Sequence, residues 1–412
     1  MRVLVYPHAM ETHEAQLNAV EIAAATRERG HDVLMASRPG PLADVARRLG
    51  LPHAVLDEGG SAQRPSRHAA AQLTELARRN RIDVVHGYEW PSALESFAGP
   101  RLRLGLPVVC TVNSMFLAPF LPRSVPLVVG TDEGRLRAVQ AGHDLVTLLE
   151  APIDLRANAP DHDPGTFRSD LGLDPAVPLV VTVGRLASEV RLDGVLGACE
   201  AVGELASWGT PVQLAVVGDG PSRPLVARAA DRANARVGRR VIALARMPRD
   251  PRPAYAAADV ILGMGASALR GLAFGKPLVV QGDRGYWELL TTDTAPQLIR
   301  QGWYGLGVEG RRAGAIRLTS ILRELVEQPE TRARLGRYSR SLVVERYSLE
   351  RTAQAQEEVY AEAIAQAARP SMRELAAEAA RAGAGLLRHK VVRAWRRWRG
   401  TAGVDEFETA GG

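Results

Sequence analysis

Short apolar runs rich in valine recur along the chain, separated by segments of helical length. In the first half they fall at residues 2–6, 32–37, 83–87, 107–112, 126–131 and 145–149, and in the second half at 178–184, 212–218, 241–244, 259–263 and 277–281. Parallel strands are buried on both faces and need crossover connections, so this alternation indicates parallel sheets covered by helices. We expect an α/β protein with two doubly wound, Rossmann-like domains in tandem.

The chain divides at a segment that has no hydrophobic periodicity. Residues 151–167 are dense in Pro, Asp and Asn, which is typical of a linker. Beyond about residue 310 the pattern is wholly helical. We predict four parts: an N-terminal domain over 1–155, a second domain over 156–345, a closing helix over 346–370 and an extension over 371–412.

The extension carries a basic amphipathic segment between residues 386 and 400. Apolar residues stand there at helical spacing and six Lys or Arg residues fill other positions; the apolar ones are Leu387, Val391, Ala394, Trp395 and Trp398. One interpretation is attachment of residues 386–399 to an anionic membrane surface, which suits Trp and Arg. The other is a helix that packs on its own domain with a solvated face. Residues 401–412 are expected to be disordered.

The composition is that of a soluble globular protein. The 412 residues are 46% hydrophobic and 24% charged with a formal net charge of +6, and no uncharged apolar run is long enough to span a bilayer. The start of the chain predicts a first strand rather than a signal peptide. We expect a cytoplasmic protein, peripheral to a membrane at most, with buried free thiols at Cys110 and Cys199, no metal and no nucleic-acid partner.

Glycines follow several predicted strands of the second domain. Ligands bind open parallel sheets at the carboxyl ends of the strands, where helix N-termini present free N–H groups. Gly184 precedes Arg185, and Arg191 follows six residues later, so two guanidinium groups could hold a diphosphate. Gly218 and Asp219 end the next strand, and residues 281–288 follow the last one. Together these strand ends predict a phosphate site.

A further strand end has two glycines, Gly263 and Gly265, which lead into a helix predicted to begin near Ser267. The N–H groups of Ala266, Ser267, Ala268 and Leu269 would then be unpaired, and the Ser267 hydroxyl could cap the helix. A helix start carries about half a positive charge, so it should attract phosphate. Arg270, one turn into the helix, adds to that charge if it faces the ligand.

The order of these segments resembles the retaining glycosyltransferases of family 4, which have the GT-B fold. The resemblance rests on VGRL with Arg191, VVGDGP, PAYAAADV, FGKPLVV, RGYWELL and YSLERTAQAQEEVY in the second half, and on EIAAATRERGHDV and VVGTDEGRLRA in the first. It covers residues 1–368. It implies two Rossmann-like domains facing a central cleft, a nucleotide-sugar donor of the UDP or GDP type, and a helix at 346–370 that returns to the first domain.

The resemblance also implies the chemistry. A hexosyl group would pass with retention to an acceptor hydroxyl, in cell-envelope glycan, glycolipid or natural-product biosynthesis. Arg185 would hold the donor diphosphate, and Arg191 stands where the family has a lysine, so the leaving group could be stabilised without a metal. The acceptor-side candidates lie on the first domain: His86 and Glu89 as catalytic groups, with His13, Tyr88, Trp90 and Asn113 around them.

The sequence departs from the family at the donor ribose. Two glutamates that precede GKP in the family are replaced by Leu262 and Arg270. We hypothesise that donor binding shifts from ribose contacts to phosphate contacts, and that Glu288 supplies a substitute contact to ribose or sugar. In the first loop, residues 10–15 replace the family's glycine pair. His86 matches the first histidine of an HxH motif, whereas Tyr88 replaces the second.

Two other interpretations stay open. A GT-B protein that has lost catalysis and only binds a sugar nucleotide would also lack the two glutamates. Gly263, Gly265 and Ala268 also fit the GxGxxA fingerprint of NAD(P)-dependent oxidoreductases, with Asp283 twenty residues beyond Gly263. That fingerprint normally follows the first strand of its domain, whereas three predicted strands precede it here.

Overall fold

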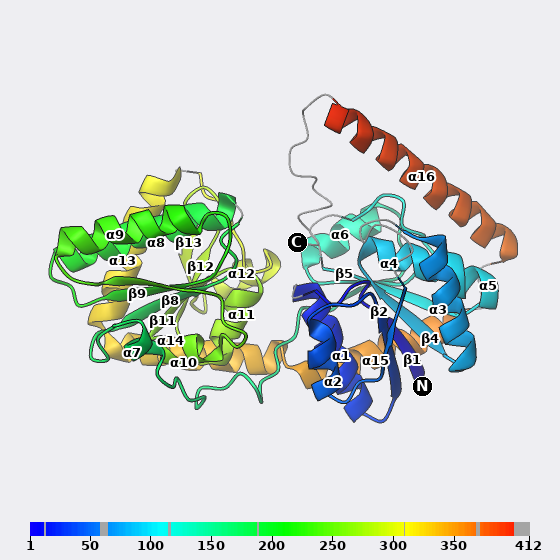
Figure 1. Ribbon diagram of the computed structural model, residues 1–412, viewed down its shortest axis with the longest axis horizontal. Helices are drawn as coiled ribbons and strands as arrows, with labels where there is room; N and C mark the ends of the chain where they lie inside the picture. Colours follow the sequence, from blue (N-terminus) through cyan, green and yellow to red (C-terminus); the bar gives the residue numbers. More distant parts are fainter. Residues whose placement is uncertain are drawn as a thin grey trace. The chain divides into compact units, whose positions relative to one another are not determined.

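The computed structural model describes residues 1–11, 14–57, 65–113, 117–187, 189–308, 310–367 and 371–398. The chain forms two compact units (Figure 1). Unit 1 comprises Met1–Pro152 with Leu349–Gly412, and unit 2 comprises Ile153–Ser348. The segment 154–166 consists of turns without a helix or strand, as the lack of periodicity predicts. His13 and residues 401–412, on which two of the predictions fall, lie outside the described residues.

Unit 1 is built on a seven-stranded parallel sheet with the order β3-β2-β1-β4-β5-β6-β7. Its strands are β1 (Arg2–Tyr6), β2 (Asp32–Ser37), β3 (His53–Val55), β4 (Val84–Tyr88), β5 (Val108–Val112), β6 (Leu127–Val129) and β7 (Val146–Leu148). The strand order reverses between β1 and β4, so the topological switch point of unit 1 lies at the carboxyl ends of those strands.

Helices cover both faces of this sheet (Figure 1). They are α1 (Glu14–Glu28), α2 (Leu42–Arg48), α3 (Arg67–Arg79), α4 (Glu89–Ser96), the π-helical turn η1 (Phe97–Arg101), α5 (Leu102–Leu104), α6 (Asp132–Gln140), α15 (Leu349–Gln366) and α16 (Met372–Trp398). Helix α3 is an example of how the sequence determines where a helix begins and which of its faces is buried. The Ser66 hydroxyl accepts the N–H groups of His68 and Ala69, and the apolar stripe from Ala69 to Ala77 is buried.

Helix α15 packs against α1 and the sheet of unit 1. Ala353 is fully buried next to Ile22, and Glu357 accepts hydrogen bonds from Arg29 (2.6 Å) and His31 (2.5 Å). The Tyr360 hydroxyl bonds Nδ1 of His86 on β4 (2.8 Å). The first and last parts of the chain therefore share one core.

Unit 2 is built on a six-stranded sheet with the order β10-β9-β8-β11-β12-β13. Its strands are β8 (Leu179–Val183), β9 (Gln213–Val217), β10 (Ile242–Ala245), β11 (Val260–Gly263), β12 (Leu278–Gln281) and β13 (Trp287–Leu289), and β13 alone runs antiparallel. The switch point lies between β8 and β11. The predicted α/β class with two parallel sheets is confirmed; the sequence did not predict β3 or β13.

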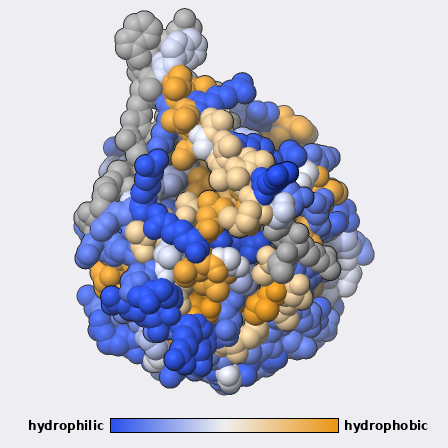
Figure 2. Space-filling view, turned by 90° about the vertical axis from the view of Figure 1, so that its right-hand side faces the viewer, coloured by the Kyte–Doolittle hydropathy of each residue, from blue (hydrophilic) through white to orange (hydrophobic). Residues whose placement is uncertain are grey.

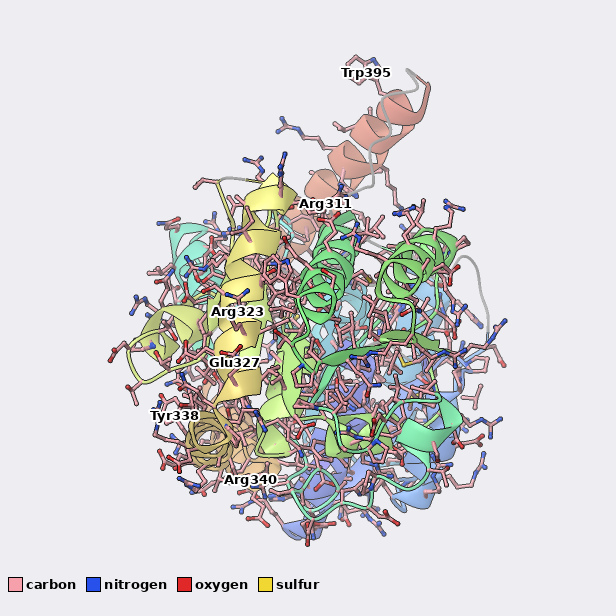
Figure 3. The ribbon with its side chains drawn as sticks, turned by 90° about the vertical axis from the view of Figure 1, so that its left-hand side faces the viewer. Arg311, Arg323, Glu327, Tyr338, Arg340 and Trp395 are labelled. Carbon is pink, nitrogen blue, oxygen red and sulfur yellow. The ribbon has the colours of Figure 1, made fainter. Side chains whose placement is uncertain are left out.

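Eight described helices belong to unit 2: α7 (Phe167–Asp170), α8 (Glu189–Ser207), α9 (Arg223–Val237), α10 (Arg252–Ala257), α11 (Ala266–Ala273), α12 (Ala295–Arg300), α13 (Gly310–Glu327) and α14 (Pro329–Arg346). Figure 3 shows Arg311 and Arg323 along α13. Arg311 lies 3.6 Å from carboxylate oxygens of Asp193 and Glu200 on α8, and the Arg323 guanidinium stacks 4.8 Å over the Trp208 ring. These contacts fasten α13 to the α8 layer.

The two cysteines and the lengths of the helices bear on two further expectations from the sequence. Cys110 and Cys199 are buried free thiols, as predicted. Among the described helices, none has the length and apolar character needed to cross a bilayer.

The burial of His86 predicts an acid-sensitive unit 1. Burial lowers the pKa of His86 to about 3, against 6.5 for a free histidine. Between these values the unfolded chain binds a proton that the folded chain excludes. Unfolding free energy should therefore fall by about 1.4 kcal/mol per pH unit per such group as pH drops below 6.5. Urea unfolding followed by circular dichroism from pH 7 to 4.5 measures this slope.

A His86→Gln variant should show a shallower slope than the native chain, although not a flat one, because the pKa values of His8 and His143 are also lowered. Tyr360→Phe is the matched control, since it removes the hydrogen bond to His86 but leaves the imidazole buried. An identical slope for His86→Gln and the native chain would show that His86 is protonated in the folded state.

Candidate functional site

The carboxyl edge of the unit 2 sheet gathers the glycine-containing loops. Strands β9, β8, β11 and β12 are neighbours in the sheet, so the loops that begin at Gly184, Gly218, Met264 and Gly282 leave the same edge. This is the edge where open parallel sheets bind ligands, and the switch point between β8 and β11 is its centre. The sequence placed its donor-binding candidates at these four strand ends.

The loops after β8 and β9 are held together by backbone hydrogen bonds. Leu186 N–H donates to the Asp219 carbonyl (2.8 Å), and Ser222 N–H donates to the Leu186 carbonyl (2.9 Å). A Cβ at Gly218 would lie 2.1 Å from the Gly184 carbonyl oxygen, so no other residue fits there. The two loops are therefore in direct backbone contact at the carboxyl edge of the sheet.

The Asp219 side chain contacts the two loops that follow β9 and β10. Its carboxylate accepts the Met247 N–H (2.8 Å) and lies 3.6 Å from Nε of Arg223. It therefore ties the loop after β9 to the loop after β10. Asp219 was predicted to contact a donor; its carboxylate already has these partners within the protein, and a contact with a donor stays a prediction.

The glycine stretch makes a sharp entry into α11. Gly265 has φ +53° and ψ −130°, a conformation that favours glycine, and its N–H donates to the Trp303 carbonyl (3.0 Å). A Cβ at Gly263 would lie 2.9 Å from the Ala268 nitrogen. The Ser267 hydroxyl bonds both the N–H and the carbonyl of Met264 (3.1 and 2.8 Å). Only two residues, Met264 and Gly265, thus connect strand β11 to helix α11.

The predicted set of four open N–H groups is wrong in part. The N–H groups of Ala268 and Leu269 both donate to the Gly265 carbonyl (3.1 and 3.2 Å), because the helix begins one residue earlier than expected. Ala266 is the first helical residue, so its N–H has no carbonyl within the helix to bond. The backbone offers fewer donors here than the sequence predicted.

Two arginines flank the switch point. Arg185, directly after Gly184, is exposed, and Arg270 is half-buried. Residues 268, 269 and 271–273 of α11 are buried, whereas Ala266, Ser267 and Arg270 share the opposite, partly open face at i, i+3 and i+4 spacing. Neither guanidinium has a carboxylate partner within the described residues. The backbone of Arg191 lies in the first turn of α8, while its side chain lies outside the described part.

The segment after β12 is a hairpin turn rather than a phosphate loop. Arg284 and Gly285 have φ +49° and +76°, and Tyr286 N–H donates to the Asp283 carbonyl (3.0 Å), which defines a type I′ turn into β13. Glu288, on β13 opposite Val280, accepts a hydrogen bond from Arg317 of α13 (2.7 Å). The carboxylate expected to contact ribose is therefore already ion-paired.

The sequence missed Trp303, which supports the glycine stretch. Trp303 is 3% exposed and has φ +61°, a strained value for a bulky residue. Its carbonyl holds Gly265 N–H, its indole N–H donates to the Tyr347 hydroxyl (3.0 Å), and the two rings meet edge to face. The contacts join residues far apart in the sequence, so no local pattern could show them.

On unit 1, His86 and Tyr88 are not available to an acceptor, contrary to prediction. His86 is fully buried; Nδ1 bonds Tyr360 and Nε2 bonds the Thr111 hydroxyl (2.7 Å). Tyr88 is 2% exposed and stacks on His86 with ring centroids 4.5 Å apart, and burial raises the pKa of its hydroxyl. Both are core residues of unit 1, because their side chains point into the α15 interface.

Glu89 and Trp90 diverge at the end of β4. Glu89 has φ +65°, and its Oε1 accepts the Asn113 N–H (2.8 Å), which links the ends of β4 and β5. Trp90 packs edge to face on Phe120, with ring centroids 5.3 Å apart. Acceptor contacts by Glu89, Trp90 and Asn113 stay predictions.

A buried polar cluster at the ends of β1 and β2 also escaped the sequence analysis. Glu95 Oε2 accepts the Tyr6 hydroxyl (2.5 Å) and lies 3.7 Å from His8 Nε2, while Oε1 accepts Ser66 N–H (2.7 Å). Burial raises the pKa of Glu95 and, with Arg38 nearby, lowers that of His8 to about 3. His8 Nε2 and one Arg38 terminal nitrogen are buried without a hydrogen-bond partner. Buried nitrogen atoms without a hydrogen-bond partner therefore lie at the carboxyl ends of β1 and β2 in unit 1.

No metal-binding cluster is formed by the part of the chain that the structure describes: three or more His, Cys, Asp or Glu side chains nowhere converge there.

Two family models match the sequence, one on each unit. The model described as Glycosyltransferase Family 4 matches residues 17–145, and the model described as Glycosyl transferases group 1 matches residues 177–304. Together they cover more than half of the chain. No curated protein sequence matches it.

The chain is also similar to solved glycosyltransferase structures. A glycosyltransferase from Rickettsia africae superposes with a TM-score of 0.70 at 15% identity, over 88% of this chain and 98% of that one. HepE of Anabaena, in complex with UDP, gives 0.67 at 16% identity over 88% and 100%. Sucrose-phosphate synthase from Thermosynechococcus elongatus gives 0.66 at 16% identity over 89% and 99%.

At these identities the similarity shows the fold, which is the GT-B fold with two Rossmann-like domains. The family models extend the assignment from fold to family. The chain belongs to glycosyltransferase family 4.

Proposed function

We propose that the carboxyl edge of unit 2 binds a nucleotide-diphosphate sugar through its diphosphate, and that the protein transfers the sugar to an acceptor hydroxyl with retention of configuration. One observation carries the proposal. Arg185 directly follows the end of β8, and Arg270 lies on the partly open face of α11, the helix that follows the neighbouring strand β11; neither forms an ion pair with a carboxylate of the described residues. Cations placed in this way can bind an anion from outside the protein.

The chemistry of transfer fits this arrangement. Negative charge grows on the diphosphate as its bond to the sugar breaks, and preorganised donors stabilise that charge. A guanidinium can bond a phosphate through two N–H groups, and the start of α11 adds the Ala266 N–H and the helix dipole. With Arg191 as a third cation, the protein could neutralise the leaving group without a metal.

Arg270 changes what the donor site recognises. It stands where the family has a glutamate that contacts ribose, and it shares the open face of α11 with Ala266. We infer that the site gains a phosphate contact and loses a ribose contact at this position. Glu288 could restore a ribose contact only after release from Arg317, so it stays secondary in the proposal.

The donor is proposed to be a UDP-sugar. HepE of Anabaena was crystallised with UDP, with UDP and glucose, and with UDP-glucose, which supports this choice over GDP. Retention follows the behaviour expected of the family. The acceptor is proposed to be a sugar, a glycolipid or a small molecule bearing a free hydroxyl.

A second candidate is a protein that binds the sugar nucleotide but no longer transfers the sugar. The replacement of the family's two glutamates by Leu262 and Arg270 favours it. Release of UDP from UDP-glucose in the presence of acceptor separates the two, because a binding protein would retain the donor intact. The oxidoreductase interpretation is not carried further, since both units match glycosyltransferase models.

Removal of either arginine should weaken nucleotide binding. Arg185→Ala and Arg270→Ala each delete a charge-assisted hydrogen bond to phosphate, worth about 1.5–3 kcal/mol, so Kd for UDP should rise roughly 10- to 100-fold. Uridine lacks the diphosphate, so its affinity should change little. Isothermal titration calorimetry with UDP and uridine measures both.

Arg239→Ala is the matched control, because Arg239 is exposed, as Arg185 is, but precedes β10 at the opposite edge of the sheet. Its UDP affinity should match that of the native protein. Arg270→Glu provides the sharper test. If tighter UDP binding followed the return of the family's glutamate, the site would be of the ribose-contacting kind and the proposal would fail.

Trp303 should act on nucleotide binding through the glycine stretch. Trp303→Phe and Tyr347→Phe each remove the same hydrogen bond, so each should weaken UDP binding several-fold; Tyr347→Phe should cost about 1 kcal/mol of unfolding free energy, and Trp303→Phe should cost more because it also leaves a cavity. In UDP affinity the double variant should be no worse than Trp303→Phe alone, because the pair shares one bond. Additive losses in UDP affinity would show that the two residues act independently and that Trp303 does not position Gly265 through Tyr347.

A further inference from the structure

Helix α16 is docked on unit 1 by the first half of its length. Leu375, Ala379, Ala382 and Leu386 pack on the core cluster that includes Phe120. A Cβ at Gly385 would lie 2.5 Å from the Phe120 Cβ, so the helix and the loop are in close contact. Glu378 accepts the Ser124 N–H (3.0 Å), which anchors the same face. One face of α16 therefore has a partner within unit 1.

The outward residues change character along the helix. Beyond Met372, which is exposed at the start of the helix (72%), the exposed positions of the docked half are small or charged and include Arg373, Ala376, Ala380 and Ala384. Further along, large apolar side chains are exposed instead: Leu387 (64%), Val391 (67%), Val392 (40%) and Trp395 (49%). A helix that only packed on its own domain would expose polar residues at these positions. The second apolar stripe is therefore left in contact with water.

The charge along this stripe has one sign. Between Ala379 and Gly400 the sequence has seven Lys or Arg residues and no Asp or Glu. Figure 2 shows apolar residues (orange) beside hydrophilic ones (blue) on the projecting upper part of the surface, where α16 lies. Figure 3 labels Trp395 at the distal end of the helix. Exposed aliphatic and indole groups thus lie among guanidinium and ammonium groups, with no carboxylate near them in sequence.

We propose that the C-terminal half of α16 binds the surface of an anionic lipid bilayer. The helix lies in the plane of the interface, with Leu387, Val391 and Trp395 entering the boundary between headgroups and acyl chains. Arg388 and Lys390 contact lipid phosphates. Such helices bind by buried apolar area together with attraction to anionic lipids, and α16 supplies both on one segment. This surface is separate from the donor site of unit 2.

Flotation of the full-length protein with lipid vesicles tests the proposal. The protein should bind vesicles of phosphatidylcholine with 30% phosphatidylglycerol, and binding to phosphatidylcholine alone should be at least tenfold weaker. Raising the salt concentration should release it. Leu387→Ser with Val391→Ser should weaken binding to the anionic vesicles at least tenfold, because the insertion of two aliphatic groups is lost.

The matched control is Ile316→Ser with Val344→Ser, which replaces two similarly exposed aliphatic residues of unit 2 (63% and 45%). Its vesicle binding should equal that of the native protein. Equal binding by the Leu387/Val391 variant, or equal binding to neutral and anionic vesicles, would overturn the proposal. So would a native dimer in sedimentation velocity that the Leu387/Val391 variant abolishes, because the stripe would then be covered by a second copy. Tight binding to DNA without vesicle binding would overturn it as well.

Discussion

Close contact between backbones at the carboxyl edge of unit 2 is the constraint on which the candidate site depends. The loops after β8 and β9 approach so closely that a Cβ at Gly218 would overlap the Gly184 carbonyl, and β11 meets α11 with no room for a Cβ at Gly263. These approaches place Arg185 and the Ala266 N–H at neighbouring strand ends of this edge, and Arg270 lies one turn further along α11. The proposed diphosphate site requires such donors to come within hydrogen-bonding distance of one ligand, which is about 3 Å.

Arg270 stands where the resemblance to the family implies a glutamate, and this change of charge alters which part of a donor the position would contact. A carboxylate at this position would face the phosphates unless ribose hydroxyls lay between them, so its presence in the family suits a ribose contact. In the proposed site, a guanidinium at the same place would attract the phosphates directly. The fold is retained, while the sign of the charge on one face of α11 is reversed. The strained Trp303, with its bond to Tyr347, shows that the entry to this helix is held from outside the helix itself.

Periodicity predicted much of the fold because buried parallel strands are continuous apolar runs. The short strands β3 and β13 were missed, since three residues with partial exposure carry little pattern. The glycines at the strand ends of unit 2 were also predicted, because residues that allow a close approach of backbones follow the strands directly in the sequence. His86 was misassigned because its role depends on Thr111 and Tyr360, which are 25 and 274 residues away. The Trp303–Tyr347 bond and the Glu95 cluster likewise join distant segments, so a single sequence could not reveal them.

Hydrogen exchange of the backbone amides, followed by mass spectrometry with and without UDP, tests the central claim most directly. Binding of the diphosphate at the switch point predicts slower exchange in peptides covering 184–187 and 264–270, and unchanged exchange around 239–242 at the opposite edge. Protection confined to unit 1, or to the β12–β13 hairpin around Glu288, would contradict the account.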